Sequence, residues 1–122
     1  MDDTDDALLI EPDSHGTLDL TNRAWVNLDP RIWNFTQTLL LLDVSYNNMF
    51  ELPVHIGELH MLREFRASFN KLIKLPSTIG KLKRLRKLIL NGNKLKHLPD
   101  EIGRLDQLEG RRGEDRLKTS KA

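Results

Sequence analysis

The sequence predicts an α/β solenoid: stacked coils that share a short, curved parallel β-sheet on the concave face and short helical or 3-10 turns on the convex face. Three observations predict this fold. One template, Leu-x-x-Leu-x-Leu-x-x-Asn-x-Leu-x-x-Leu-Pro-x-x-Ile-Gly-x-Leu, occurs three times. Its copies begin at Leu39, Leu62 and Leu85, at a constant interval of 23 residues. The same places are apolar in each copy, as expected for units that bury a face only by stacking on their neighbours.

The first half of each copy predicts a strand. Apolar residues there alternate with other residues, as in Leu42 and Val44, so that one side of the chain faces the core. Successive strands should pair in parallel. Asn47, Asn70 and Asn93 follow the strands, where a short polar side chain can satisfy backbone groups that the turning chain would otherwise bury unpaired.

The second half of each copy predicts the convex turn. Pro53, Pro76 and Pro99 end the extended run and can open a short helical turn. The Ile-Gly-x-Leu that follows should let this turn pack closely on the next coil. Each copy therefore supplies one strand and one turn.

A degenerate fourth copy precedes the other three. It keeps apolar residues in the expected places, namely Leu18, Leu20, Trp25, Leu28, Ile32 and Phe35. His15 replaces the first Leu, Arg23 the Asn, Asp29 the Pro and Trp33 the Gly, as expected for an end repeat. Four coils exceed the three or so that a repeat stack needs for stability.

Three segments follow from the register. Residues 1–14 form an acidic cap in which Leu8, Leu9 and Ile10 should cover the first coil. Residues 15–108 form the repeat domain, about four repeats starting near 15, 39, 62 and 85, and 109–122 form a basic tail. Leu108 falls on the next start, but Arg111 and Gly113 occupy places that require Leu. Unless Leu117 folds back, we expect the stack to end there with the edge of its sheet exposed, together with the flanks of Leu88, Leu90 and Leu95.

Composition predicts a soluble cytoplasmic module. The 122 residues suit one domain, and the longest apolar run, Leu39 to Leu42, is far too short to span a membrane. The acidic start, Asp2 to Asp6, does not resemble a secretory signal. The chain has no cysteine, which favours an intracellular location over a disulfide-closed extracellular repeat protein.

Charge is divided between the two halves of the chain. Residues 1–61 hold two basic and eleven acidic side chains, a net charge of −9, whereas residues 62–122 hold seventeen basic and seven acidic ones, a net of +10. The strongest basic patch comprises Lys81, Lys83, Arg84, Arg86, Arg111 and Arg112. Such a patch is either a solvated convex face with a tail or a surface for nucleic acid or an acidic protein.

The strand residues that point away from the core define the predicted concave face. We number the places of the template from its first Leu; the third, fifth, seventh and eighth should face the concave side, and neighbouring strands lie about 4.8 Å apart. The candidate partner-binding residues are Asp19, Leu41, Asp43, Tyr46, Glu64, Arg66, Phe69, Lys87 and Ile89. The eighth place puts Tyr46 beside Phe69, and the fifth allows an Asp43–Arg66 pair. Adjacent rings between opposite charges are typical of a binding hot spot; alternatively they only shield the backbone.

No catalytic constellation emerges from the sequence. His15, His55, His60 and His97 fall on different faces in this register, so no metal site is expected. Phosphate-cradling glycine motifs, a Gly-x-Ser-x-Gly elbow and a Cys-His pair are all absent from the sequence. We expect no enzyme activity, cofactor or small-molecule substrate.

The Leu-Pro-x-x-Ile-Gly-x-Leu half of the template, as in Leu52 to Leu59, resembles the intracellular leucine-rich repeats of the Ras-suppressor and Scribble type. The resemblance covers about residues 18–108. It implies a protein–protein interaction module, an adaptor or subunit of a larger assembly that binds a protein partner on its concave face. The alternatives are a nucleic-acid-contacting subunit of a ribonucleoprotein that uses the basic C-terminal half, and a truncated isoform. No membrane partner is expected.

Overall fold

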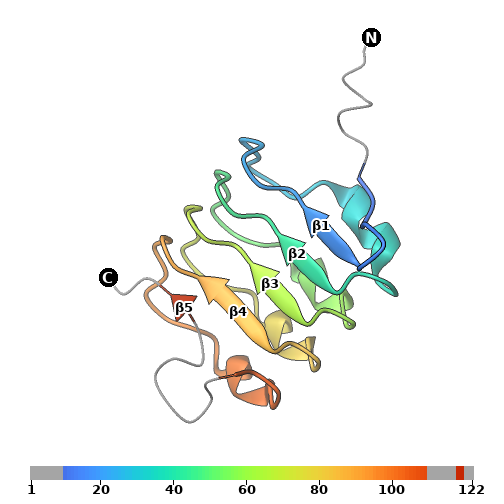
Figure 1. The fold of residues 1–122 in the computed structure, drawn as a ribbon. Helices are drawn as coiled ribbons and strands as arrows, with labels where there is room; N and C mark the ends of the chain where they lie inside the picture. The colour runs from blue at the N-terminus through green and yellow to red at the C-terminus, as the bar shows by residue number, and fades with distance from the viewer. Residues whose placement is uncertain (1–9, 110–117, 120–122) are drawn as a thin grey trace.

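The computed structural model describes residues 10–109 and the short strand at 118–119. The strands form one parallel sheet in chain order, β1 (Thr17–Asp19), β2 (Leu41–Asp43), β3 (Glu64–Arg66), β4 (Lys87–Leu90) and β5 (Lys118–Thr119). Between them lie four 3-10 helices, η1 (Pro30–Phe35), η2 (Val54–Glu58), η3 (Ser77–Lys81) and η4 (Asp100–Arg104). Figure 1 shows the sheet along one side of the stack and the helices along the other. The predicted α/β solenoid is confirmed.

The sheet is in register with the sequence template. Leu42 of β2 lies opposite Leu18 of β1 and Phe65 of β3, and Phe65 lies opposite Leu88 of β4. Equivalent template places in successive coils are therefore direct neighbours. Because the strands are parallel, each coil must return across the core before the next strand begins, and the 3-10 helices make that return.

One continuous hydrophobic core fills the space between sheet and helices. The inward strand residues Leu42 and Phe65 and the turn residues Ile56 and Ile79 are fully buried. Trp25, Trp33 and Phe35 of the degenerate first coil are partly buried and pack against the same cluster. The first copy thus contributes to the core despite its four departures from the template.

Glycines in the convex turns allow the coils to approach each other. A Cβ added at Gly57 would lie 2.8 Å from the backbone oxygen of Thr78, and one at Gly80 would lie 2.7 Å from Cβ and 2.8 Å from the oxygen of Glu101. At Gly103 nothing lies within 4 Å of an added Cβ in the part of the chain that the structure describes. The same template residue is therefore under packing constraint in two coils and free of it in the third.

Gly80→Ala is expected to destabilise the fold by about 1–3 kcal/mol, because the added methyl meets the backbone of the next turn. Gly103→Ala, the matched change one coil later, should stay within about 0.5 kcal/mol of wild type. Urea unfolding of the two variants measures the difference. Equal losses for both would mean that the glycine is needed for its backbone conformation rather than for close approach.

The first convex turn is built differently from the others. η1 is capped by Asp29, whose carboxylate accepts a hydrogen bond from the Arg31 amide (2.9 Å) and forms an ion pair with the Arg31 guanidinium (2.7 Å). Pro30 occupies the first helical turn, whereas η2, η3 and η4 begin after a proline with no side-chain cap. Trp33, in the glycine place, packs against the ring of His55 at 5.8 Å between centroids. The end repeat replaces close backbone packing by a capped turn and a ring contact.

This capped turn should make stability depend on acidic pH. The Arg31 side chain, which is its hydrogen-bond partner, lowers the pKa of Asp29 below the ordinary 3.8. The folded state therefore binds this proton less readily than the unfolded chain, so the contribution is present above about pH 4 and is lost as pH falls through the folded-state pKa. Asp29→Asn keeps the cap acceptor without the charge. Between about pH 5 and pH 2 its melting temperature should fall less than that of wild type; identical profiles would contradict this role.

The two ends of the stack differ from one another. Ile10 is buried, as the predicted cap requires, while Leu8 and Leu9 lie outside the described residues. The prediction of an exposed sheet edge is wrong, because β5 pairs with β4 through Ile89–Lys118 and Leu90–Thr119. Leu88, Leu90 and Leu95 are buried as well. An unpaired edge strand can pair with an extended segment through backbone groups alone. Such pairing leaves no pattern in the side chains from which it could be predicted.

Candidate binding face

The structure brings the predicted concave residues onto one side of the sheet. The third-place residues lie in register, Leu41 opposite Glu64 and Glu64 opposite Lys87, and so do the fifth-place residues, Asp43 opposite Arg66 and Arg66 opposite Ile89. All of these side chains are exposed or half-buried, as is Asp19 of β1. Figure 1 shows the strands that carry them, β1 to β4, side by side in the sheet. The strands therefore present a small, chemically mixed surface to solvent.

Charge on this face changes from one end to the other. The guanidinium of Arg66 bonds mainly to Glu64 of its own strand, and its distance to Asp43 is 3.9 Å, at the limit of an ion pair. The predicted Asp43–Arg66 pair thus exists only as the weaker half of a three-residue cluster. Hydrogen bonds from the amide and hydroxyl of Thr21 lower the pKa of Asp19, so that its carboxylate is ionised at neutral pH. The face is acidic at β1 and β2, carries the Arg66–Glu64 pair at β3, and is basic at Lys87 of β4.

Two stacked aromatic rings mark the ends of β2 and β3. The rings of Tyr46 and Phe69 lie 4.9 Å apart between centroids at an interplanar angle of 14°, and the two residues are 53% and 47% exposed. Phe69 in turn covers Gly92, where an added Cβ would lie 2.5 Å from the ring. The sequence predicted the neighbouring rings. In the structure, the next coil has Gly92 in this place. Because Gly92 has no side chain, the Phe69 ring can lie against its backbone.

The backbone beneath the rings has an unusual conformation. Tyr46 and Phe69 have φ angles of +59° and +54°, and the same template place in the flanking coils has +57° at Asn22 and +79° at Gly92. Gly and Asn tolerate this left-handed region, whereas a bulky aromatic residue there is strained. This conformation was not predicted from the sequence, although Asn and Gly in the same place of the flanking coils were a signal for it.

In the second and third coils the seventh place does not face the concave surface as predicted. Ser45 and Ser68 are buried, and the Ser68 amide donates to the Ser45 hydroxyl at 3.0 Å. The Ser68 hydroxyl lies 2.7 Å from Oδ1 of Asn91 in the next coil. The chain begins to turn at this place, so small polar side chains reach the neighbouring turn rather than solvent. They are part of the scaffold and are not available to a partner.

A buried asparagine in each of three coils bonds to the backbone of the preceding coil. We call Asn47, Asn70 and Asn93 the asparagine ladder. Asn70 accepts a hydrogen bond from the Met49 amide (3.1 Å) and donates to the carbonyl of Val44 (3.0 Å), both in the preceding coil. Asn47 and Asn93 make the same kind of bridge to their own preceding coils. All three are buried. The predicted satisfaction of turning backbone by this residue is confirmed.

The predicted basic patch lies apart from the aromatic rings. Lys81 ends η3, and Lys83, Arg84 and Arg86 lie in the segment that leads into β4, all exposed. Arg84 contacts the sulfur of Met61 at 3.4 Å, and Arg86 lies 4.0 Å from Glu109. Arg111 and Arg112 lie outside the described residues. The described part of the patch therefore flanks the start of β4, whereas Tyr46 and Phe69 follow the ends of their strands.

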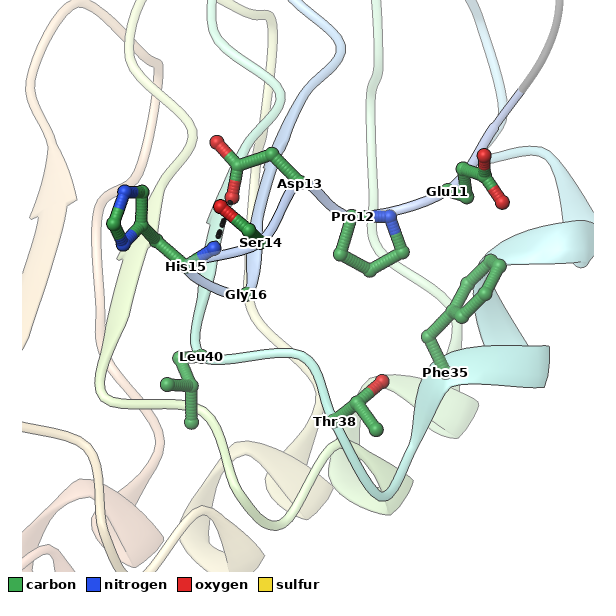
Figure 2. Close-up of a pocket in the computed structure, with 9 residues that line it drawn as sticks. All are labelled: Glu11, Pro12, Asp13, Ser14, His15, Gly16, Phe35, Thr38 and Leu40. Atoms are coloured by element: carbon green, nitrogen blue, oxygen red, sulfur yellow. Dashed lines mark hydrogen bonds between the residues drawn. The ribbon is translucent and has the colours of Figure 1, made fainter.

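A hollow also lies beside the first coil. About 700 Å³ in volume, it lies between the segment 11–16 and the side chains of Phe35, Thr38 and Leu40 (Figure 2). The Asp13 carboxylate in its wall accepts hydrogen bonds from the amides of Thr17 and His15, which lower the pKa of Asp13. This carboxylate shapes a turn rather than poising a proton for chemistry.

Two features that would indicate other functions are absent from the described residues. Within residues 10–109 and 118–119, no group of three or more His, Cys, Asp or Glu side chains could hold a metal ion. No helix in that part of the chain is long and apolar enough to cross a membrane.

Comparison with known proteins supports the repeat assignment. Residues 84–105 match the family model described as Leucine Rich Repeat. The structure is similar to that of a leucine-rich repeat protein of Leptospira interrogans, with a TM-score of 0.56 and 32% sequence identity over 75% of this chain. This chain covers 29% of that protein's length. No curated protein sequence gives a significant match.

The fold is therefore a leucine-rich repeat solenoid. Such domains generally mediate protein–protein interaction, since the curved stack creates an extended concave surface.

Proposed function

We propose that this chain is a non-enzymatic protein–protein interaction module, a cytoplasmic adaptor or subunit of a larger assembly that binds a protein partner through its concave face. The observation that carries the proposal is the stacked, half-exposed pair of Tyr46 and Phe69. The likeness of the Leu-Pro-x-x-Ile-Gly-x-Leu motif to repeats of the Ras-suppressor and Scribble type supports the adaptor role and the intracellular location.

The aromatic pair has the properties of an interface anchor. Tyr is among the residue types that most often carry binding energy, and aromatic rings give large contact areas. Here the rings are held before any partner arrives, by stacking on each other and by Phe69 lying on Gly92. Binding would therefore lose little side-chain entropy.

The charged residues around the pair would orient the partner. Carboxylates of Asp19 and Asp43 lie toward one end of the face and Lys87 toward the other. Complementary charge contributes more to orientation and association rate than to affinity, so a partner with basic and acidic groups in the opposite order fits best.

Affinity purification from a cell lysate at about 0.15 M salt tests the proposal, with and without nuclease. We expect proteins that survive nuclease treatment and are lost when Tyr46 and Phe69 are both replaced by Gly. Val54→Ser, at a convex residue 61% exposed, is the control and should retain them. Recovery that disappears with nuclease, or that falls steeply with salt, would instead favour the nucleic-acid alternative.

A further inference from the structure

A second apolar surface lies beside the concave face, in the segments that follow the strands. The residue in the twelfth template place points outward in each of the first three coils: Val26, Phe50 and Ile73 are 52%, 50% and 55% exposed. We call these three residues the lateral ladder. In Figure 1 the segments that contain them form a row of loops beyond the tips of the strand arrows. Single exposed apolar residues are ordinary, but three in the same place of successive coils form a row.

Backbone contacts show that the lateral ladder is continuous. The amide of Ile73 donates to the carbonyl of Phe50 at 3.1 Å, and the amide of Asn48 donates to the carbonyl of Trp25 at 2.7 Å. The loops are thus directly bonded from coil to coil. Their outward residues stand at the spacing of the coils.

Positive charge surrounds the C-terminal end of the ladder. Lys96 takes the twelfth place in the fourth coil, and Lys71, Lys74 and Lys94 occupy neighbouring places, all exposed. The Lys71 amine lies 5.7 Å from the centroid of the Phe50 ring. Within the described residues no carboxylate lies within ion-pair distance of these four amines. Glu51 is the acidic residue next to the ladder in sequence.

We propose that the lateral ladder is a second docking surface, which takes an acidic amphipathic segment of a partner protein. Apolar side chains of that segment would cover Val26, Phe50 and Ile73, and its carboxylates would meet the four lysines. A nucleic acid would leave the apolar row uncovered. A second copy of this chain, docked through the same surface, would offer the four lysines another apolar row and more lysines, with Glu51 as the acidic residue next to the ladder.

The test uses a synthetic peptide of alternating acidic and large apolar residues, with a control peptide in which Lys replaces each acid. NMR titration of the isotope-labelled chain should show the largest amide shifts at Val26, Phe50 and Ile73. Phe50→Ser combined with Ile73→Ser should weaken binding tenfold or more, and so should Lys94→Glu combined with Lys96→Glu. Val54→Ser, equally exposed but on the convex side, should change nothing.

Each contrary result overturns the proposal. Tight binding of the basic peptide would show that the lysines do not select an acidic partner. Dimerisation through the lateral ladder would show that a second copy of this chain occupies it. Loss of peptide binding in the double variant Tyr46→Gly, Phe69→Gly would place the peptide on the concave face. Should the Phe50 and Ile73 changes disturb folding, the lysine reversal decides alone, since those side chains are exposed. Concave-face binding can fail without affecting any of these outcomes.

Discussion

Replacing Tyr46 and Phe69 together by Gly is expected to weaken binding of a concave-face partner by about 2 kcal/mol or more, roughly thirtyfold in Kd. Both rings are about half exposed, so their remaining surface is available for burial by a partner. Isothermal titration calorimetry with the purified partner measures the loss. The Val54→Ser control, which changes an exposed apolar residue on the opposite side, should bind as wild type does.

The same double change should leave the free energy of unfolding close to that of wild type. Left-handed backbone costs a residue with a Cβ about 1–2 kcal/mol, and Gly removes that strain. Against this gain stand the lost ring stacking, about 0.5–1.5 kcal/mol, and the greater freedom of Gly in the unfolded chain, about 0.5–1 kcal/mol per residue.

The double Ala variant separates these contributions. It loses the rings but keeps the left-handed strain at +59° and +54°, so it should be less stable than the double Gly variant by about 1–2 kcal/mol. A Gly variant is usually less stable than the corresponding Ala variant, so the stability order expected here is the reverse of the usual one. An Ala variant as stable as the Gly variant would show that the backbone relaxes when the rings are removed, and that their strain is not a property of the fold.

Asn70→Ala is expected to cost about 1–3 kcal/mol of folding stability, because it leaves buried backbone groups without partners. The side chain joins the Met49 amide and the Val44 carbonyl, and neither has water as a ready substitute at this buried position. Urea unfolding followed by circular dichroism gives the change. Asn48→Ala is a matched control, because this half-buried side chain makes no hydrogen bond to other described residues.

The position of an asparagine in the stack should affect its contribution. Asn93 makes bonds as short as those of Asn70, 2.9 Å from the Leu72 amide and 2.8 Å to the Ala67 carbonyl. It nevertheless belongs to a coil nearer the end of the stack, where local opening is easier. Asn93→Ala should therefore cost less than Asn70→Ala. Equal costs would indicate that the stack unfolds as one unit without weak ends.

The sequence was sufficient for the parts of the fold that depend on side-chain pattern. The 23-residue interval predicted the strand register, and the polar asparagines at 47, 70 and 93 predicted buried bridges to backbone. The left-handed backbone of Tyr46 and Phe69 was not predicted, because aromatic residues rarely adopt it and the neighbouring Asn22 and Gly92 carried the only hint. The pairing of β5 was missed because it depends on backbone groups, to which Lys118 and Thr119 give no distinctive side-chain pattern.

The candidate surfaces were likewise predicted only in part from the side-chain pattern. The twelfth place is variable in the template, so the exposed apolar row at Val26, Phe50 and Ile73 was not predicted from the sequence. Conversely, Ser45 and Ser68 were assigned to the concave surface by counting alone, whereas a turn that begins one residue early buries them. Periodicity places residues on a coil correctly, but it does not say where within the coil the chain changes direction.

The constant register has a consequence for how this chain can change over evolution. Because every bridge of the asparagine ladder runs from one coil to the preceding coil, removing residues 62–84 would join Met61 to Leu85 and preserve the order of template places. Tyr46 and Gly92 would then hold the eighth template place in neighbouring coils. Duplication or loss of coding sequence one coil long is thus structurally conservative, whereas shorter insertions break the register. Each such step would lengthen or shorten both proposed binding surfaces together.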